Sequence, residues 1–213
     1  MGVQYVIWDW NGTLLDDAQL CVDVMNRMLG KRGLPLLDLA HYREIFTFPV
    51  EKYYRAAGLD LEKEGFAQLA EEYIRPYNRE ALGCGLCPGA REALEGLKAQ
   101  GVKQLIASAS HQEALEEQVE SLGIGGYFED LLGIRDIFGG GKAGLAKVYL
   151  EGRGIGPSRA WCVGDTLHDW EVAQAMGCPC ALVAQGHQSA RRLSQAGVPV
   201  LETPAQLLGL YSQ

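Results

Sequence analysis

The chain has 213 residues, 47% of them hydrophobic and 22% charged, which suits one soluble globular domain with, at most, a modest insertion. The formal net charge is −8 and no Lys/Arg run is visible, so nucleic acid and anionic membranes are poor candidates for the main partner. No apolar run reaches the ~18 residues of a membrane-spanning helix, and the N-terminal segment does not look like a signal peptide. We therefore expect a cytoplasmic protein.

The first apolar run, Val3–Trp8, predicts a strand that is followed by a long helical interval. More than ninety residues separate this run from the next one, which is too much for a single crossover connection. The helical stretches in this interval are Ala18–Arg32, Leu37–Ile45, Glu51–Ala57 and Glu62–Asn78. We interpret residues 16–82 as an inserted helical cap with hinges after Leu14 and in Gly83–Gly89.

The remainder of the chain alternates between short apolar runs and helical stretches. The further expected strands are Val102–Ala107, Ala160–Val163, Cys180–Ala184 and Val198–Leu201. The expected helices are Gly89–Gln100, Gln112–Leu122, Leu145–Gly152, Trp170–Met176 and Ser189–Ala196. This alternation predicts an α/β fold, a doubly wound parallel sheet with right-handed crossovers, formed by residues 1–15 and 83–213.

Polar side chains follow three of the expected strands directly. Asp9 follows the first run, Ser108 the second, and Asp165 comes one residue after the glycine that ends the third. Since ligands of such sheets lie beyond the carboxyl ends of the strands, we expect these residues to form one site.

The residue types at this edge point to phosphoryl chemistry. Asp9 can attack phosphorus and also bind a metal ion, and Asp165 and Asp169 add oxygen ligands of the kind that Mg²⁺ prefers. Ser108 and the amides near Ala109 are expected to hold a phosphate oxygen. A lysine should neutralise the remaining charge; Lys142, which follows Gly139–Gly141 and precedes a helix, is the first candidate, and Lys147 is the alternative.

Four motifs in this order resemble those of the haloacid dehalogenase superfamily. They are Asp9–Thr13 after a strand, Ser108 at a strand end, Lys142 before a helix, and Gly164-Asp165 with Asp169. The arrangement, including the helical interval, is most similar to the phosphoglycolate-phosphatase group. This resemblance implies a Rossmann-like core with an α-helical cap, and a Mg²⁺-dependent phosphatase that acts on a small phosphorylated metabolite, a phosphoglycolate-like phosphomonoester, through an aspartyl-phosphate.

The resemblance also assigns the site residues by role. Catalysis is assigned to Asp9, Asn11 and Lys142, and metal binding to Asp9, Asn11, Asp165 and Asp169. Substrate and phosphate binding are assigned to Ser108, Ala109, Thr13 and Thr47, the last because the loop at residues 46–49 could extend over the site. The expected partner is the small metabolite, without nucleic acid or membrane, and the protein is expected to be a monomer or homodimer.

Asn11 departs from the motif, which usually has a second Asp at this position as the general acid. An amide cannot donate that proton, although its backbone carbonyl can still bind Mg²⁺. The loss of a general acid typically costs ~10²–10⁴-fold in rate. Four explanations stay open: a good leaving group, a replacement acid such as His111 or water, a slow enzyme, or deamidation of Asn11-Gly12 to Asp.

Three other functions are consistent with the same motifs. One is a phosphotransferase or mutase, and another is a phosphometabolite-binding protein that has lost turnover because of Asn11. Carbon–halogen hydrolases also lack this Asp, but they use no metal and would not need Asp165 and Asp169. His168 could contact the water shell of the metal ion, although a surface position is the simpler expectation.

The six cysteines are expected to be reduced thiols, because cytosolic proteins rarely hold structural disulfides. Cys84 and Cys87 have zinc-ligand spacing, and Cys178 and Cys180 form a second pair. The predicted fold keeps the two pairs apart, which argues against a shared zinc site.

Overall fold

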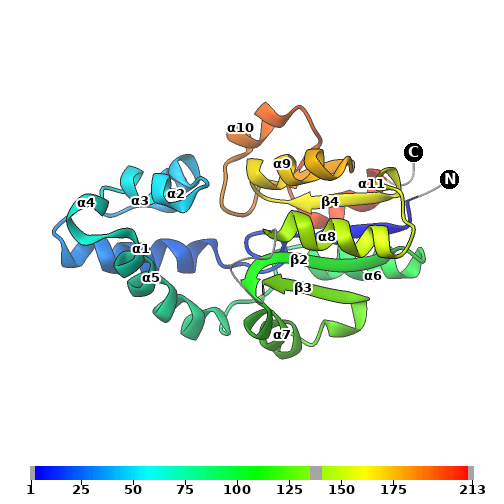
Figure 1. Ribbon diagram of the computed structural model, residues 1–213, viewed down its shortest axis with the longest axis horizontal. Helices are drawn as coiled ribbons and strands as arrows, with labels where there is room; N and C mark the ends of the chain where they lie inside the picture. Colours follow the sequence, from blue (N-terminus) through cyan, green and yellow to red (C-terminus); the bar gives the residue numbers. More distant parts are fainter. Residues whose placement is uncertain (1–2, 135–140, 211–213) are drawn as a thin grey trace.

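The computed structural model describes residues 3–134 and 141–210, with the side chains of residues 141–143 excluded. Within this part the strands form one parallel sheet with the order β3-β2-β1-β4-β5-β6 (Figure 1). The strands are β1 (Tyr5–Trp8), β2 (Lys103–His111), β3 (Asp130–Ile134), β4 (Ala160–Gly164), β5 (Cys180–Val183) and β6 (Val200–Leu201). The α/β class and parallel sheet predicted from the sequence are confirmed.

The central strand β1 is buried on both faces, and its side chains alternate between two hydrophobic cores. Val6 and Trp8 pack into one core, whereas Tyr5 and Ile7 pack into the other, on the opposite face of the sheet. Trp8 donates its indole N–H to the Gln104 side chain at 2.9 Å, so the polar atom on this buried ring is satisfied. Burial on both faces explains why β1 is a continuous apolar run in the sequence.

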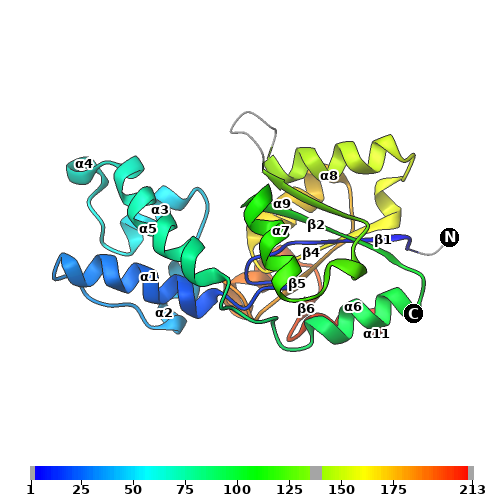
Figure 2. The same ribbon diagram turned by 90° about the horizontal axis from the view of Figure 1, so that it is seen from below.

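Helices cover both faces of the sheet (Figure 2). They are α6 (Ala90–Ala99), α7 (Gln112–Ser121), α8 (Gly141–Gly152), α9 (Leu167–Met176), α10 (Ala190–Leu193) and α11 (Leu207–Leu210). Short 3₁₀ turns lie at Gly125–Tyr127, Pro157–Arg159, Ser194–Ala196 and Pro204–Gln206. None of the helices in the described ranges combines the length and apolarity that crossing a membrane requires.

The chain between β1 and α6 folds into helices that lie beyond the carboxyl ends of the strands, on the left in Figures 1 and 2. They are α1 (Ala18–Lys31), α2 (Leu39–Ile45), α3 (Val50–Ala56), α4 (Leu61–Glu64) and α5 (Phe66–Ala81), which we call the helical insert. The insert has a hydrophobic cluster of its own, built on Met25, Leu29, Tyr42 and Tyr53 among others. Its separate core is what an independently packed subdomain requires.

The insert also contacts the segment after β5. Arg43 of α2 donates to the carbonyls of Gln185 and Gly186, the latter at 2.9 Å. In return, Arg192 of α10 donates to the carbonyl of Phe46 at 2.5 Å. These contacts hold α2 against the core at the edge of the sheet where the strands end.

Several elements differ from the sequence-based expectation; among them, the expected helix Ser189–Ala196 is the short α10 followed by a 3₁₀ turn, and α11 was not expected. The strand β3 was not expected, because Asp130–Ile134 is an edge strand of mixed polarity and only partial burial. The expected helix Glu62–Asn78 is two helices, α4 and α5, which meet at Gly65 with a φ of +78°. Strand β2 extends to His111, and its pairing with β3 is irregular beyond Ala107. This extension was not predicted, because the polar end of the strand carries no apolar pattern.

Candidate active site

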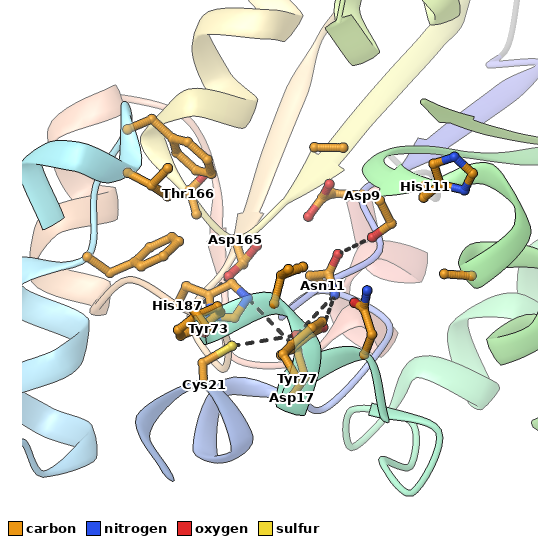
Figure 3. Close-up of a pocket in the computed structure, with 18 of the residues that line it drawn as sticks. Asp9, Asn11, Asp17, Cys21, Tyr73, Tyr77, His111, Asp165, Thr166 and His187 are labelled. Carbon is orange, nitrogen blue, oxygen red and sulfur yellow. Dashed lines mark hydrogen bonds and ion pairs between the residues drawn. The ribbon is translucent and has the colours of Figure 1, made fainter. Parts of the chain in front are cut away.

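Three carboxylates meet at the carboxyl ends of the central strands. Asp9 follows β1 and Asp165 follows the neighbouring strand β4 (Figure 3). Asp169 lies in the first turn of α9. One oxygen of each lies within 4.8 Å of the others. Because β1 and β4 pair in parallel, residues 152 or more positions apart in the chain are placed side by side here.

Asp165 is fully buried and held from two sides. Thr13 donates its hydroxyl to one carboxylate oxygen at 3.2 Å, and the backbone N–H of His187 donates to the other at 2.5 Å. Gly12 allows this close packing: it has a φ of +73°, and a Cβ there would lie 2.3 Å from the Asp165 carboxylate. The turn after β1 therefore positions a carboxylate that belongs to β4.

Asp169 has a structural role as well as its place in the carboxylate cluster. It forms a capping box with Thr166 at the start of α9, accepting the Thr166 backbone N–H at 2.9 Å and its hydroxyl at 2.6 Å. A Cβ on Gly164 would lie 2.2 Å from the Asp169 carboxyl carbon, so only glycine fits at the end of β4. The same carboxylate thus stabilises the helix and contributes to the cluster.

The Asn11 side chain is held at both ends of its amide. Its oxygen accepts the hydroxyl of Ser110 at 2.8 Å. Its nitrogen donates to the Tyr77 hydroxyl at 2.6 Å and to Asp17 at 3.0 Å. Both N–H groups are therefore used, and the amide has no remaining donor for a leaving group.

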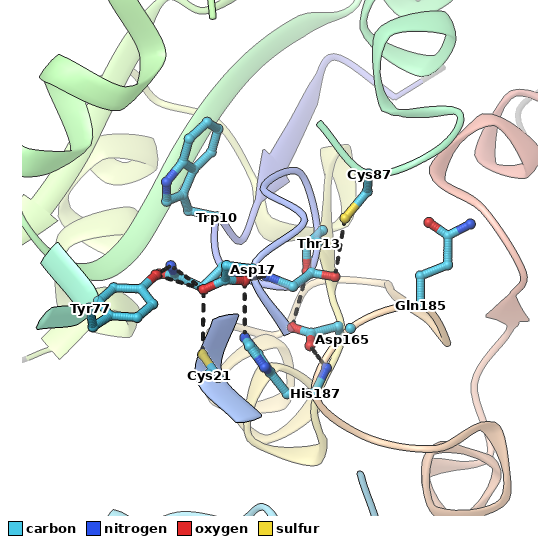
Figure 4. A network of polar contacts seen from close by, with 12 residues as sticks. Trp10, Thr13, Asp17, Cys21, Tyr77, Cys87, Asp165, Gln185 and His187 are labelled. Atoms are coloured by element: carbon cyan, nitrogen blue, oxygen red, sulfur yellow. Dashed lines mark hydrogen bonds and ion pairs between the residues drawn. The ribbon is translucent and has the colours of Figure 1, made fainter. Parts of the chain in front are cut away.

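A buried polar network behind Asn11 joins the core to the insert (Figure 4). At its centre Asp17, 1% exposed, accepts from Tyr77 at 2.6 Å and from the backbone of Gly12 at 2.8 Å. Nε2 of His187 lies 3.5 Å from Asp17, and Nδ1 is 2.8 Å from the Tyr42 hydroxyl.

The ligand atoms of Asp17, Cys21 and His187 lie within 4.8 Å of one another, and burial together with Asp17 raises the pKa of the Cys21 thiol. Because Asp17 and His187 both have hydrogen-bond partners in the protein, we interpret the network as a structural link.

A cavity of about 420 Å³ lies over the carboxylates, between the core and the insert. The core side is polar, with Asp9, Asn11 and Ser110 among its residues. The insert side is mainly apolar and aromatic, and it includes Phe46, Phe48, Val50, Tyr73 and Ile74. Figure 3 shows this cavity with Asp9 and Asp165 on one side and Tyr73 and Tyr77 on the other.

The residues assigned to phosphate binding are spread over different environments. Ala109 lines the cavity. Ser108 is 1% exposed and accepts the Ser110 backbone N–H at 3.0 Å, while Thr13 is fully buried against Asp165. Of the described residues, neither of these two nor Thr47 lines the cavity, although Phe46 and Phe48 on either side of Thr47 do. The structure thus brings Ser110, not Ser108, against Asn11.

The lysines and the remaining histidines have distinct places. Lys142 lies in the first turn of α8, and its side chain is outside the described part of the structure. The Lys147 side chain is exposed, and its ammonium lies 3.9 Å from the Glu151 carboxylate. His111 lines the cavity, whereas His168 lies outside the cavity lining, with its ring 4.9 Å from that of Phe48.

The cysteine pairs have no shared site among the described residues. The potential metal-binding groups found there include neither pair. All six cysteines are free thiols, as expected from the sequence. Cys87 donates to the Gly12 carbonyl at 3.7 Å, and burial raises the pKa of Cys84 to about 11.

Sequence reasoning missed Asp17, Tyr77, His187 and Ser110. Asp17 stands next to the first motif, but its partners come from α5 and from the segment after β5, 60 and 170 residues further along the chain. No local pattern marks such partners. Ser110 had a weak signal, because it lies two residues after Ser108 in the same polar strand end.

The fold and the carboxylate cluster together place the chain in the class of α/β hydrolytic enzymes with a carboxylate-based site. The model of the haloacid dehalogenase-like hydrolase family matches residues 6–183. The chain therefore belongs to this family.

Individual relatives and solved structures share less than 30% sequence identity with the chain. A phosphoglycolate phosphatase from Aquifex aeolicus is 28% identical over 192 residues, covering 87% of this chain and 86% of that protein. The tyrosine-protein kinase PtkA of Mycobacterium tuberculosis is also 28% identical, over 96% of this chain and 70% of its own length. A haloacid dehalogenase-like family hydrolase from Streptococcus pneumoniae superposes with a TM-score of 0.83 at 19% identity, covering 98% of each chain. This last likeness shows the fold alone.

Proposed function

We propose that the chain is a Mg²⁺-dependent phosphatase that hydrolyses the phosphomonoester of a small metabolite through an aspartyl-phosphate on Asp9. The observation that carries this proposal is the cluster of Asp9, Asp165 and Asp169 at the open edge of the sheet. Membership of a hydrolase family and similarity to proteins named phosphoglycolate phosphatase support it.

The donor set of this cluster fits Mg²⁺. The three carboxylates, one half-buried and two buried, offer hard oxygen ligands within 4.8 Å of one another, and the cavity leaves room for water and a phosphate oxygen. Asp9, Asp165 and Asp169, with the backbone carbonyl of Asn11, would hold the ion. When bound, it would supply positive charge that offsets the charge on the phosphoryl oxygens.

The protein's own groups would then act in sequence. An Asp9 oxygen attacks phosphorus and forms an O–P bond as the bond to the leaving oxygen breaks. Water next attacks the same phosphorus, which releases inorganic phosphate and restores the Asp9 carboxylate. The leaving oxygen takes its proton from water, because the Asn11 amide is too weakly acidic to transfer one and its N–H groups are hydrogen-bonded to Tyr77 and Asp17. We assign charge neutralisation to Lys142, as expected from the motif.

The helical insert would serve as the cap of this site. It forms one wall of the cavity, and it is connected to the core through the segment after β1 and through residues 82–89. Closure over the bound substrate would exclude water from the phosphoryl group. A cavity of about 420 Å³ is suited to a small metabolite and not to a folded phosphoprotein.

The test is phosphate release from a panel of phosphorylated metabolites, with Mg²⁺ and with a chelator. We expect turnover that requires Mg²⁺ and that falls to background in Asp9→Asn. Activity of Asp9→Asn equal to that of the wild type would contradict the proposal, because no other residue is assigned as nucleophile.

Asn11 favours a second candidate, a phosphometabolite-binding protein with slow turnover. In that case ligand binding by calorimetry would be tight while phosphate release stays near background in every assay. A phosphotransferase would instead make a new phosphate ester only when an acceptor alcohol is added, and product analysis separates this outcome from hydrolysis.

A further inference from the structure

A second, mainly apolar cavity adjoins the insert side of the active-site cavity. This second space, also about 420 Å³, lies within the insert and is lined mainly by aromatic and aliphatic side chains. Phe46, Val50, Tyr73 and Ile74 line both cavities. We call the apolar side of the first cavity and the adjoining second cavity the apolar chamber.

The size of this chamber exceeds the needs of a two-carbon leaving group. Cavities of about 300–1,000 Å³ typically enclose drug-sized ligands, and the active-site cavity alone falls in that range. A small substrate would not reach the cavity-facing surfaces of Phe46, Phe48 and Tyr73, so most of this apolar surface would contribute nothing to binding. A larger apolar group would remove this surface from water and gain the corresponding free energy.

The charges around the chamber disfavour an anionic leaving group. Of the described residues that line the two cavities, none is a Lys or Arg. Two arginines of the insert are engaged elsewhere: Arg43 donates to the carbonyls of Gln185 and Gly186, and Arg75 pairs with Glu71. A carboxylate placed here would lose its hydration without gaining a cation, which is costly.

The histidines do not change this balance on the insert side. His187 is buried between Tyr42 and Asp17, and Asp17 itself brings a carboxylate to the cavity lining. His111 belongs to the core, where it precedes α7, and not to the insert. The groups that would face the leaving portion of a substrate are therefore mainly apolar, and the polar ones among the described insert residues, Tyr77 and Asn78 with the carboxylates of Asp17 and Glu71, include no Lys or Arg.

We infer that the substrate is the phosphomonoester of a bulky uncharged alkyl or aryl alcohol, and not of a hydroxy-carboxylate such as glycolate. This inference rests on the proposed function and names its substrate class. The phosphoryl group lies at the carboxylates and the apolar body fills the chamber. Hydrolysis breaks the bond between phosphorus and the alcohol oxygen and yields the alcohol and inorganic phosphate.

A homologous ester series tests the inference without changing the chemistry of the leaving group. Ethyl, butyl and hexyl phosphate have alcohols of nearly equal acidity, so differences in kcat/KM report contacts with the alkyl chain. Each added methylene should raise kcat/KM by about fourfold while the chamber has room. Phosphoglycolate should fall below butyl phosphate, and the reverse order would overturn the inference while leaving the phosphatase activity intact.

A charged variant with a matched control tests the position of the chamber. Ile74 and Leu36 are both exposed apolar residues of the insert segment, 45% and 62% exposed, but only Ile74 lines the cavities. Ile74→Arg should lower kcat/KM for hexyl phosphate and raise it for phosphoglycolate, each by about tenfold or more. Leu36→Arg should leave both values near those of the wild type. Equal effects of the two variants would contradict the assignment.

Binding of non-hydrolysable phosphonates separates this inference from the proposed function. Calorimetry with Mg²⁺ should show hexylphosphonate binding more tightly than phosphonoacetate. Absence of turnover together with this order of affinity would overturn the phosphatase function and support the apolar chamber. Tighter binding of phosphonoacetate, or binding of neither compound, would overturn the inference.

Discussion

Asn11 stands at the boundary between the carboxylate cluster and the buried network of the insert. Its amide contacts Ser110 on the core side and Tyr77 and Asp17 on the insert side. The neutral amide can donate to Asp17, whereas a carboxylate at the same position would face another carboxylate. The amide thus links the core and the insert, but it leaves the phosphoryl site without the proton donor that a carboxyl group would supply.

The variant Asn11→Asp tests whether the missing proton donor limits the rate of hydrolysis. Next to Asp17, the new carboxyl group is favoured in its protonated form, which is the form that a general acid requires. We expect the rate with alkyl phosphates to rise by about tenfold or more, because the leaving alkoxide then receives a proton. Aryl phosphates, which leave without help, should change little. An equal response of both ester types would mean that proton donation is not what the wild type lacks.

Two buried tyrosines form a matched pair for testing the network. The Tyr77 hydroxyl bonds to Asp17 and Asn11, whereas the buried Tyr53 hydroxyl has no hydrogen-bond partner among the described residues. Tyr77→Phe should lower the free energy of unfolding by about 1–3 kcal/mol, because Asp17 loses a donor. Tyr53→Phe should be neutral or stabilising. Chemical denaturation of the two variants measures the difference, and equal losses would argue against a special role for Tyr77.

At the scale of elements, the described helices of the insert bury several phenol groups. Tyr42 of α2, Tyr53 and Tyr54 of α3, and Tyr77 of α5 are each less than 10% exposed. Burial raises the pKa of all four, since the phenolate would lose its hydration. The packing that forms the insert's core therefore also makes it sensitive to high pH.

The raised tyrosine pKa values predict a loss of stability in alkali. Below about pH 10 the phenols are protonated in both states, so their contribution is fully present. Above about pH 10 the unfolded chain releases these protons while the fold keeps them, and each such tyrosine lowers the free energy of unfolding by about 1.4 kcal/mol per pH unit. Tyrosinate absorbance should show these groups ionising only together with the loss of helical circular dichroism. Reversible ionisation of every tyrosine near pH 10, with the helices intact, would refute the prediction.

At the scale of the whole molecule, the carboxylate cluster is assembled from distant parts of the chain. Asp9 comes from the first strand, and Asp165 and Asp169 come from the fourth strand and the helix after it. Contacts from Thr13 and His187 bring two further segments against Asp165. Carboxylates this close repel one another unless a cation or hydrogen-bond donors offset their charge. Because the cluster exists only in the folded state, a bound metal ion should stabilise the folded state and not the unfolded chain.

Metal addition should therefore raise the melting temperature. At a Mg²⁺ concentration tenfold above its Kd, binding to the fold adds about 1.4 kcal/mol, or about 3–6 °C for a chain of this size. A chelator should reverse the shift. Asp165→Asn should remove it, and the exposed substitution Leu36→Arg should not. A shift of the same size in Asp165→Asn would place the ion elsewhere.

Much of the fold and part of the site could be predicted from local sequence. The runs at β1 and β4 are buried on both faces, so they are apolar and recognisable, and parallel pairing places Asp9 and Asp165 at one edge. The weakly patterned β3 and the break at Gly65 could not be predicted, because partial burial and a single glycine leave little signal.

By itself, then, the sequence determined the α/β class, the positions of the main strands along the chain and the carboxylates that follow them, since these depend on burial and on residue type along short stretches. Only the tertiary structure decided how Asn11 is held, that Asp17, Tyr77 and His187 form one network, and that Phe46, Tyr73 and Ile74 line both the active-site cavity and the apolar cavity beside it. Those features arise where the insert packs against the core, and contacts between segments so far apart in the chain leave no periodic pattern in either one.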